Sequence, residues 1–250
     1  MICKLCDRET KLIKAHIIPE KFFLCFRSEK KVPELHSNIK NVYPKRIPIG
    51  IYDKNILCAA CDNKIGVWDN YAQNLLLGEF SEENSIHVNG KKIAYKIENY
   101  DFDKLKLFFL SIIWRASISS EPFYVKINLG PYQDVIKKMI LNADPGAEDQ
   151  YQVVLAKFSD PNIKSILDPH MDKFDHVNFI RVYLTGFVAY IKVDKRKCPV
   201  FMNDLFMRRN EPLILPLRDV HGSQDGQLLK ELHLLAMKKK KRYRDRDAHH

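Results

Sequence analysis

Two Cys-x-x-Cys pairs are the residues of this chain best suited to bind a metal ion. Cys3 and Cys6 form the first pair, and Cys58 and Cys61 form the second. Structural zinc sites are usually closed by four Cys or His ligands in a tetrahedron, with each pair of ligands held in a tight turn. The sequence therefore predicts one structural Zn²⁺ shared by the two pairs. The alternative, four unrelated reduced thiols in a core, fits poorly with their identical spacing and polar neighbours.

A histidine and several polar side chains lie close to these pairs in the sequence. His16 stands in the segment Lys14-Ala15-His16-Ile17-Ile18-Pro19, Asn55 precedes the second pair, and Asp62-Asn63-Lys64 follows it. A single histidine beside apolar residues is usually a core residue, and an Asn at the start of a helix is often only a cap. Together, however, these residue types can supply a general base and oxygen ligands for a hydrated cation.

With this order and spacing, the first part of the chain resembles the zinc-stapled members of the HNH (ββα-metal, treble-clef) endonuclease superfamily. The family pattern is C-x-x-C, then D-H-I-x-P, then N-x-x-L-C-x-x-C-[HN]. The resemblance covers about residues 1–75, and no family is recognised in residues 80–250. The matching segments are Cys3-x-x-Cys6, His16-Ile17-Ile18-Pro19, Asn55-Ile56-Leu57, Cys58-x-x-Cys61 and Asp62-Asn63-Lys64.

The resemblance implies a role for each matching polar residue. His16 falls on the general base that takes a proton from the water attacking a phosphodiester. Asn55 matches the central Asn that braces the loop holding this histidine. Asn63 matches the usual ligand of the catalytic metal at the start of the helix, and Asp62 is a second possible ligand. The implied metal is Mg²⁺ or Mn²⁺, which polarises the phosphate and stabilises the leaving oxygen.

One position departs from the family pattern. The family usually has an Asp directly before the histidine as a ligand of the catalytic metal, and this chain has Ala15 there. Asp53, Asp62 and Asp69 are the candidates to replace the missing carboxylate. If none does, metal affinity is weak, or the module has lost catalysis and kept binding.

Positive charge is concentrated at the two ends of the chain, which carries a net charge of +10. Residues 1–70 contain 13 Lys and Arg against 8 Asp and Glu, and residues 238–247 contain 7 against 2. Such charge can neutralise phosphates and favours a nucleic-acid partner, although a solvated basic surface explains it equally well. The candidate phosphate contacts are Lys45 and Arg46, which stand between two prolines, and Lys64.

Two hypotheses of different classes follow. The first is a metal-dependent HNH-type endonuclease acting on DNA, for which the family resemblance makes phage defence a common setting and a targeting protein partner possible. The second is a catalytically inactive, zinc-stapled nucleic-acid-binding or adaptor protein. A third and weaker hypothesis makes residues 80–250 the active part, as a small-molecule sensor. The group Asp168, His170, Asp172 and His176 is assigned to a surface loop.

Composition points to a cytoplasmic protein without a membrane segment. No apolar run reaches about 18 residues, and the start of the chain lacks the features of a secretory signal. Disulfides are therefore not expected, and Cys25 and Cys198 are interpreted as small buried hydrophobes. The oligomeric state is not indicated.

The predicted fold class is α+β, with three parts. A small zinc-bound treble-clef module over 1–78 precedes a larger mixed domain with an antiparallel sheet over 79–237, and a basic tail follows over 238–250. Asn89-Gly90 is a strong hairpin signal between strands at 85–88 and 92–97. Residues 9–14 are expected to form a short strand, Pro19 to begin a short helix, and Trp68 to lie in the core. Further helices are expected over 62–77, 103–119, 131–141 and 227–237, a loop over 28–50, and strands over 151–158, 176–184, 187–193 and 213–217.

Overall fold

The structure, a computed structural model, gives the fold of most of the chain. The basic tail expected over 238–250 lies outside the described residues, as do Cys25, most of the loop expected over 28–50 and most of the terminal helix. For residues 34–35 and 45–46 only the backbone is described. The described residues are 1–24, 34–35, 45–47, 50–161, 166–219, 226–227 and 234.

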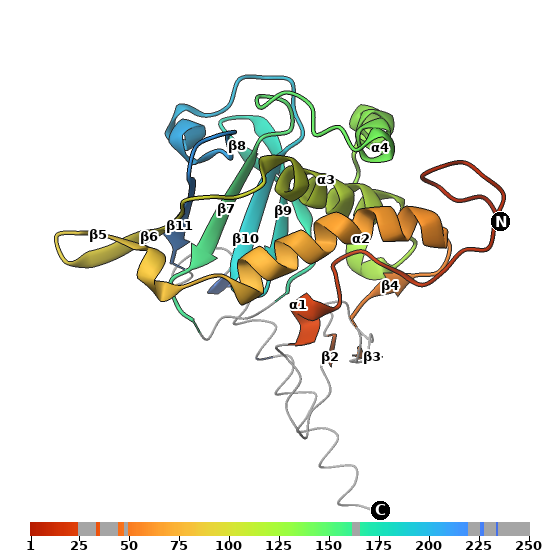
Figure 1. Cartoon of the computed structure of the whole chain (residues 1–250), viewed down its shortest axis with the longest axis horizontal. Coiled ribbons are helices and arrows are strands. Elements are labelled where there is room, and N and C mark those ends of the chain that lie inside the picture. Colours follow the sequence, from red (N-terminus) through yellow and green to blue (C-terminus); the bar gives the residue numbers. More distant parts are fainter. Residues whose placement is uncertain are drawn as a thin grey trace, which may run out of the picture.

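A seven-stranded sheet forms the centre of the molecule (Figure 1). Its order is β5-β6-β11-β7-β10-β9-β8, and neighbouring strands are antiparallel except β11 and β7, which are parallel. The expected α+β class is confirmed. The strands are β5 (Ser85–Val88), β6 (Lys91–Ile97), β7 (Val153–Phe158), β8 (His170–Phe174), β9 (Val177–Leu184), β10 (Phe187–Lys192) and β11 (Leu213–Arg218).

The expected surface loop around residues 168–176 is in part a strand, β8. His170 and Asp172, assigned to a surface loop, lie instead in this edge strand, which pairs with β9. Its side chains alternate between half-buried and exposed, so the apolar signal of a strand is weak there. Asp172 forms an ion pair with the buried Arg181 of β9. The local charge is therefore structural.

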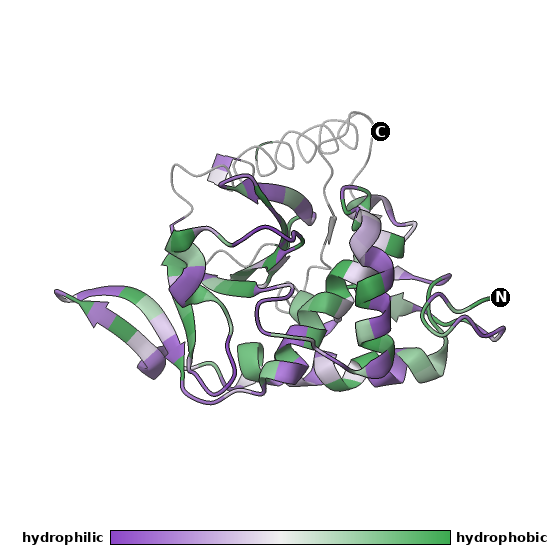
Figure 2. Cartoon of the chain, turned by 90° about the horizontal axis from the view of Figure 1, so that it is seen from above, coloured by the Kyte–Doolittle hydropathy of each residue, from purple (hydrophilic) through white to green (hydrophobic). Residues whose placement is uncertain are grey.

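The expected Asn-Gly hairpin is confirmed. Asn89 has φ 50° and Gly90 has φ 73°, the left-handed pair that a two-residue type I′ turn requires. The hairpin of β5 and β6 projects from the body of the molecule and carries a mixture of polar and apolar residues (Figure 2).

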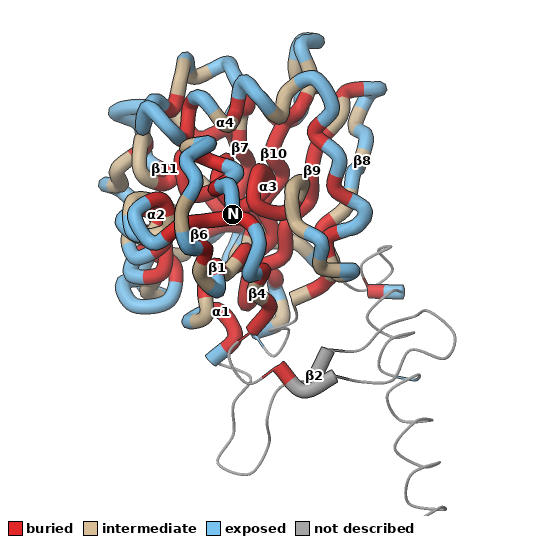
Figure 3. Tube along the Cα trace, turned by 90° about the vertical axis from the view of Figure 1, so that its right-hand side faces the viewer, coloured by how far each residue is buried: buried red, intermediate tan, exposed pale blue. Residues whose placement is uncertain are grey.

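Helices cover one face of the sheet. α3 (Phe102–Ile118) is the central one, and every residue from Leu105 to Ala116 is buried. It begins where the side chain of Asp101 accepts a hydrogen bond from the N–H of Lys104, as an N-cap does. α2 (Ala59–Gln73), which continues into a π-helical turn over Asn74–Gly78, and α4 (Gln133–Asn142) both pack against α3. Figure 3 shows that buried residues concentrate in α3 and the central strands.

The sheet divides two apolar cores. Phe187, Ala189 and Ile191 of β10 belong to the core shared with the helices, whereas Val188 and Tyr190 belong to a second core on the opposite face. This alternation is the period-two pattern of a strand buried on both faces. Within the part of the chain that the structure describes, no helix has the length and apolar character needed to cross a membrane.

The N-terminal segment packs on the same core as α3. Its short elements are β1 (Ala15–His16), α1 (Lys21–Leu24), β2 (Glu34–Leu35), β3 (Lys45–Arg46) and β4 (Tyr52–Asp53). The strand expected over 9–14 is wrong, because that segment makes only isolated bridges, Ile2 with Glu9 and Leu12 with Cys58. Trp68 is buried, as expected, and residues from both expected domains share the core.

A buried ion pair joins α2, α3 and β1. The guanidinium of Arg115 donates to both carboxylate oxygens of Asp69, at 2.8 and 2.9 Å. The same guanidinium donates to the backbone oxygen of His16 at 2.7 Å and to the hydroxyl of Ser111 at 3.0 Å. Burial raises the pKa of Asp69, and the neighbouring Arg115 opposes that shift. The position of His16 therefore depends on a pair that water does not screen.

Replacing Arg115 with Met should lower the free energy of unfolding by about 3–5 kcal/mol, because the buried carboxylate of Asp69 loses its partner. The double variant Arg115→Met/Asp69→Leu should recover much of that loss, since both charges are removed. Urea denaturation followed by circular dichroism measures both.

The exposed pair Lys96–Glu98, with 2.7 Å between nitrogen and oxygen, provides a matched control. Lys96→Met breaks it and should change stability little. Equal losses in Arg115→Met and Lys96→Met would show that the buried pair has no special role.

Candidate metal centre and active site

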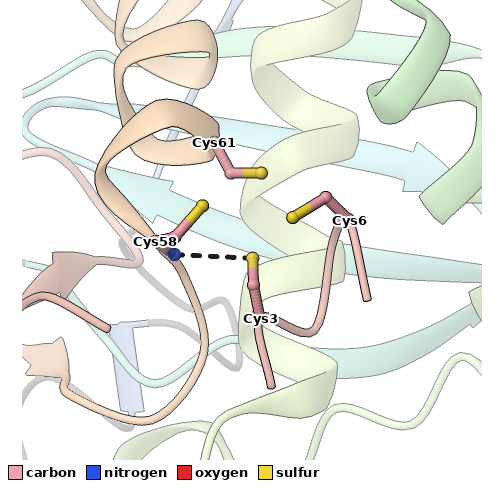
Figure 4. Close-up of side chains that lie close together, drawn as sticks. All are labelled: Cys3, Cys6, Cys58 and Cys61. Carbon is pink, nitrogen blue, oxygen red and sulfur yellow. Dashed lines mark hydrogen bonds between the residues drawn. The ribbon is translucent and has the colours of Figure 1, made fainter. Parts of the chain in front are cut away.

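The two cysteine pairs meet in space. The four sulfur atoms of Cys3, Cys6, Cys58 and Cys61 all lie within 4.8 Å of one another, and they point toward a common centre (Figure 4). Tetrahedral ligands about 2.3 Å from an ion lie about 3.8 Å apart, so small movements of these side chains would close a metal site. The four cysteines can therefore hold a metal ion.

The first pair lies in a tight turn at the start of the chain. The N–H of Asp7 donates to the backbone oxygen of Cys3 at 2.9 Å, and the N–H of Cys3 donates to the backbone oxygen of Arg8 at 3.0 Å. A hydrogen bond from the backbone of Arg8 is the main cause that lowers the pKa of Cys6 to about 6. The turn thus stabilises thiolate in advance of any metal.

The second pair begins helix α2. Cys58 is the N-cap residue and Cys61 lies in the first turn, where the partial positive charge of the helix N-terminus favours thiolates. The N–H of Cys58 donates to the sulfur of Cys3 at 3.4 Å, so the helix end and the first turn are already in contact. Burial raises the pKa of Cys61. A bound cation would offset that effect, since metal binding deprotonates thiols.

His16 lies on β1 beside this cluster. Residue 16 pairs with Tyr52 of β4, and the two rings meet edge to face with centroids 6.0 Å apart. The residue is half-buried, so its imidazole retains access to solvent. It interacts electrostatically with Asp62 and Asp69 of α2. His16 therefore interacts with two carboxylates of α2, one in the first turn of the helix and one about two turns further along.

Asp62 is the carboxylate of this group with the most freedom to take a new partner. It is half-buried, and none of the hydrogen bonds among the described residues ends on its side chain. Burial raises its pKa, while Arg115 and His16 oppose that shift. Asn63 is exposed and lies about 100° further around the helix axis. Asp62 therefore interacts electrostatically with His16, whereas Asn63 lies on a more exposed part of the helix surface.

The other two candidates for the missing carboxylate already have partners. Asp69 is occupied by Arg115. Asp53 accepts from the backbone N–H groups of Asn55 and Ser120 at 2.8 Å, and from the hydroxyl groups of Ser119 and Ser120 at 3.0 Å. Although burial disfavours its charge, these hydrogen bonds hold the pKa of Asp53 below its usual value. Of the three candidate carboxylates, Asp62 is the one whose side chain has no hydrogen bond or ion pair with another described residue.

Asp53, and not Asn55, makes the side-chain contacts that anchor β4, the strand paired with β1. The side chain of Asn55 is exposed, and no hydrogen bond from its amide to another described residue is present. The carboxylate of Asp53 instead connects β4 to the residues that follow α3. The sequence offered no local signal for this contact, because Ser119 and Ser120 lie more than 60 positions away.

The expected phosphate contacts are only partly described. Lys64 donates from Nζ to the backbone oxygen of Leu141, so it connects α2 to the end of α4. Lys45 and Arg46 lie in β3, and their side chains are outside the described part of the chain. Arg115 was not among the predicted site residues, although a single Arg inside the apolar run of α3 is a signal that could have pointed to it.

Comparison with known proteins gave no relative: no family model, curated protein sequence or solved structure matches this chain.

The purified chain should carry about one metal ion, and Cys58→Ser should release it and destabilise the N-terminal segment, because metal binding there contributes directly to folding. Acid should release the ion as well, since protons compete for the thiolates, and occupancy should rise with pH. Elemental mass spectrometry and thermal melting measure these effects.

Cys198→Ser is the matched control, because Cys198 lies outside the cluster. It should keep the metal. Unchanged metal content in Cys58→Ser would exclude the proposed ligand set.

Proposed function

We propose that this protein is a metal-dependent HNH-type endonuclease that hydrolyses phosphodiester bonds in DNA. The observation that carries the proposal is the junction of three parts: a four-cysteine cluster, the N-terminus of α2 that supplies two of these cysteines, and the electrostatic interaction between His16 of β1 and Asp62 of α2. The resemblance of residues 1–75 to the HNH superfamily supports the same assignment.

The cluster is proposed to hold a structural Zn²⁺. Four thiolates in a tetrahedral cluster suit zinc, and a closed set of four protein ligands leaves no open position for chemistry. Its role would be to fix the turn containing Cys3 and Cys6 against the helix that begins at Cys58. Reduced thiols of this kind suit a reducing compartment, and we place the protein in the cytoplasm.

His16 is proposed as the general base. Its half-buried imidazole can accept a proton from water, and a neutral imidazole does so near neutral pH. The hydrogen bond from Arg115 to its backbone oxygen and the pairing of β1 with β4 hold the residue in place. Arg115 is thus a positioning residue that acts through the backbone.

Asp62 is proposed to bind the catalytic Mg²⁺ or Mn²⁺. One or two carboxylates together with substrate phosphates are the usual protein ligands of Mg²⁺. Because burial destabilises its charge, the carboxylate of Asp62 would gain from a nearby cation. When bound, the ion would stabilise negative charge on the phosphate and the leaving oxygen. Asp62 thereby takes the role that Ala15 cannot fill.

DNA is the proposed substrate because positive charge is concentrated in the N-terminal 70 residues and at the C-terminal end. Recruitment by a partner protein and a role in phage defence belong to the same proposal through the family resemblance. The alternative function, a zinc-stapled binding or adaptor protein, is favoured by one observation: Ala15 stands where the family has a metal-binding Asp.

His16→Ala should slow the cleavage of supercoiled plasmid DNA in Mg²⁺ or Mn²⁺ by about 10²–10⁴-fold, because general-base catalysis contributes that much. Asp62→Asn should reduce cleavage and raise the Mg²⁺ concentration required. Both variants should keep the structural metal and the native circular dichroism spectrum.

His87→Ala is the matched control, since His87 is exposed on the β5–β6 hairpin. It should cut DNA like the unchanged protein. If the unchanged protein binds DNA but never cuts it, or if His16→Ala cuts at the full rate, the endonuclease proposal is wrong and the adaptor function is favoured.

A further inference from the structure

A cavity of about 670 Å³ opens at the end of the sheet where β7 begins and β10 ends. The start of α4 forms one side of it, and the loop that follows β10 forms another. Its volume lies within the range of about 300–1,000 Å³ that is typical of small-molecule sites. The residues that line it include neither the four cysteines nor His16 and Asp62.

The cavity has an excess of positive charge. Lys192, at the end of β10, is only 5% exposed and lines the cavity. Its ammonium group donates a hydrogen bond to the thiol of Cys198, which is a weak acceptor. Among the described residues, no ion pair joins this ammonium group to a carboxylate, and a buried cation in that state gains from an incoming anion. Lys192 is therefore the strongest indication of what the cavity binds.

Two exposed lysines reinforce this charge. Lys195 and Lys197 line the cavity, and neither forms an ion pair with another described residue. Arg196 is different, because its guanidinium forms an ion pair with Asp194. The backbone N–H of Arg196 also donates to the carboxylate of Asp194, at 2.9 Å. The two lysines are thus available to an anion, whereas most of the charge of Arg196 is already compensated.

Helix α4 adds to the same field. Pro131, Tyr132 and Val135 around its start line the cavity, and a helix N-terminus carries partial positive charge. Besides Asp194, one other carboxylate lines the cavity, that of Asp149. The buried Lys106 interacts with Asp149 and offsets the negative charge of that carboxylate. Basic side chains and a helix end therefore act together on one space.

Aromatic and amide groups occupy the rest of the wall. Tyr132 is half-buried, and Tyr151 meets it edge to face with ring centroids 6.0 Å apart. Tyr151 has φ 49°, a left-handed conformation that is costly for an aromatic residue and that is often found at binding sites. The amides of Gln150, Gln152 and Asn203 also line the cavity and can donate to or accept from the edge of a planar ring.

We propose that this cavity binds a free mononucleotide. The phosphates would contact Lys192, Lys195 and Lys197, and the base would lie against Tyr132 near the amides. Stacking on an aromatic ring and charge-assisted hydrogen bonds to phosphate are the two interactions that nucleotides use most. A single concave space lined by three lysines and an aromatic ring suits one nucleotide rather than a continuous strand. The site is separate from the proposed endonuclease site, and its function does not depend on that proposal.

Isothermal titration calorimetry of the full chain with AMP, ATP, GMP and GTP tests the proposal, with inorganic phosphate and a short single-stranded DNA as separate arms. At least one mononucleotide should bind saturably at one site per chain and more tightly than phosphate. Lys195→Ala/Lys197→Ala should weaken this binding by about tenfold or more, because two charge-assisted contacts are lost. Tyr132→Ala should weaken it as well, whereas Tyr132→Phe should retain it because the ring is kept.

The matched control is Lys91→Ala/Lys173→Ala, which removes the same charge from two exposed lysines away from the cavity. This variant should bind the nucleotide like the unchanged protein. The proposal is overturned if no mononucleotide binds at millimolar concentration or if only the single-stranded DNA binds. Equal losses in the control and in the cavity variant would also overturn it. Because no readout here involves DNA cleavage, failure of the endonuclease proposal leaves this test unaffected.

Discussion

The guanidinium of Arg115 connects the parts of this molecule that any chemistry at His16 would need. It lies in the most buried helix, forms both hydrogen bonds of a fork with Asp69 of α2, and donates to the backbone oxygen of His16 on β1. A buried fork of this kind leaves little freedom in the relative position of its partners. The four cysteines lie at the N-terminus of α2, where Cys58 and Cys61 meet the turn that contains Cys3 and Cys6. The ion pair therefore connects β1 to α2, and the cysteine cluster brings the turn at the start of the chain against the N-terminus of α2.

Helix α4 relates this region to the rest of the domain. Lys137 forms an ion pair with Asp7 beside the first cysteine turn, at 2.7 Å, and Lys64 of α2 donates to the backbone oxygen of Leu141. The start of the same helix lines the cavity at the end of the sheet. One short helix thus contacts both the possible metal centre and the cavity. These contacts, together with the common apolar core, join the N-terminal segment to the helices that follow it.

The sequence predicted the regular elements well because their signals are local. The Asn89-Gly90 turn, the apolar run of α3 and the alternating strands β7, β9 and β10 all lie where their patterns indicated. The four-cysteine cluster was also predictable, since the spacing of each pair sets its geometry. Strand β8 was missed because its exposed edge carries charged residues rather than an apolar pattern. The partners of Asp53 and Asp69 could not be foreseen, because Ser119, Ser120 and Arg115 are far away in sequence and meet them only through tertiary packing.

Anomalous diffraction from crystals of the full chain grown with Mn²⁺ and a short DNA duplex would test the central claim most directly. Data collected at the X-ray absorption edges of zinc and of manganese distinguish the two elements. The account predicts a zinc peak centred among the four sulfur atoms and a separate manganese peak between the carboxylate of Asp62 and a DNA phosphate, within reach of the His16 imidazole. A manganese peak absent from that place in crystals that contain bound DNA would contradict it.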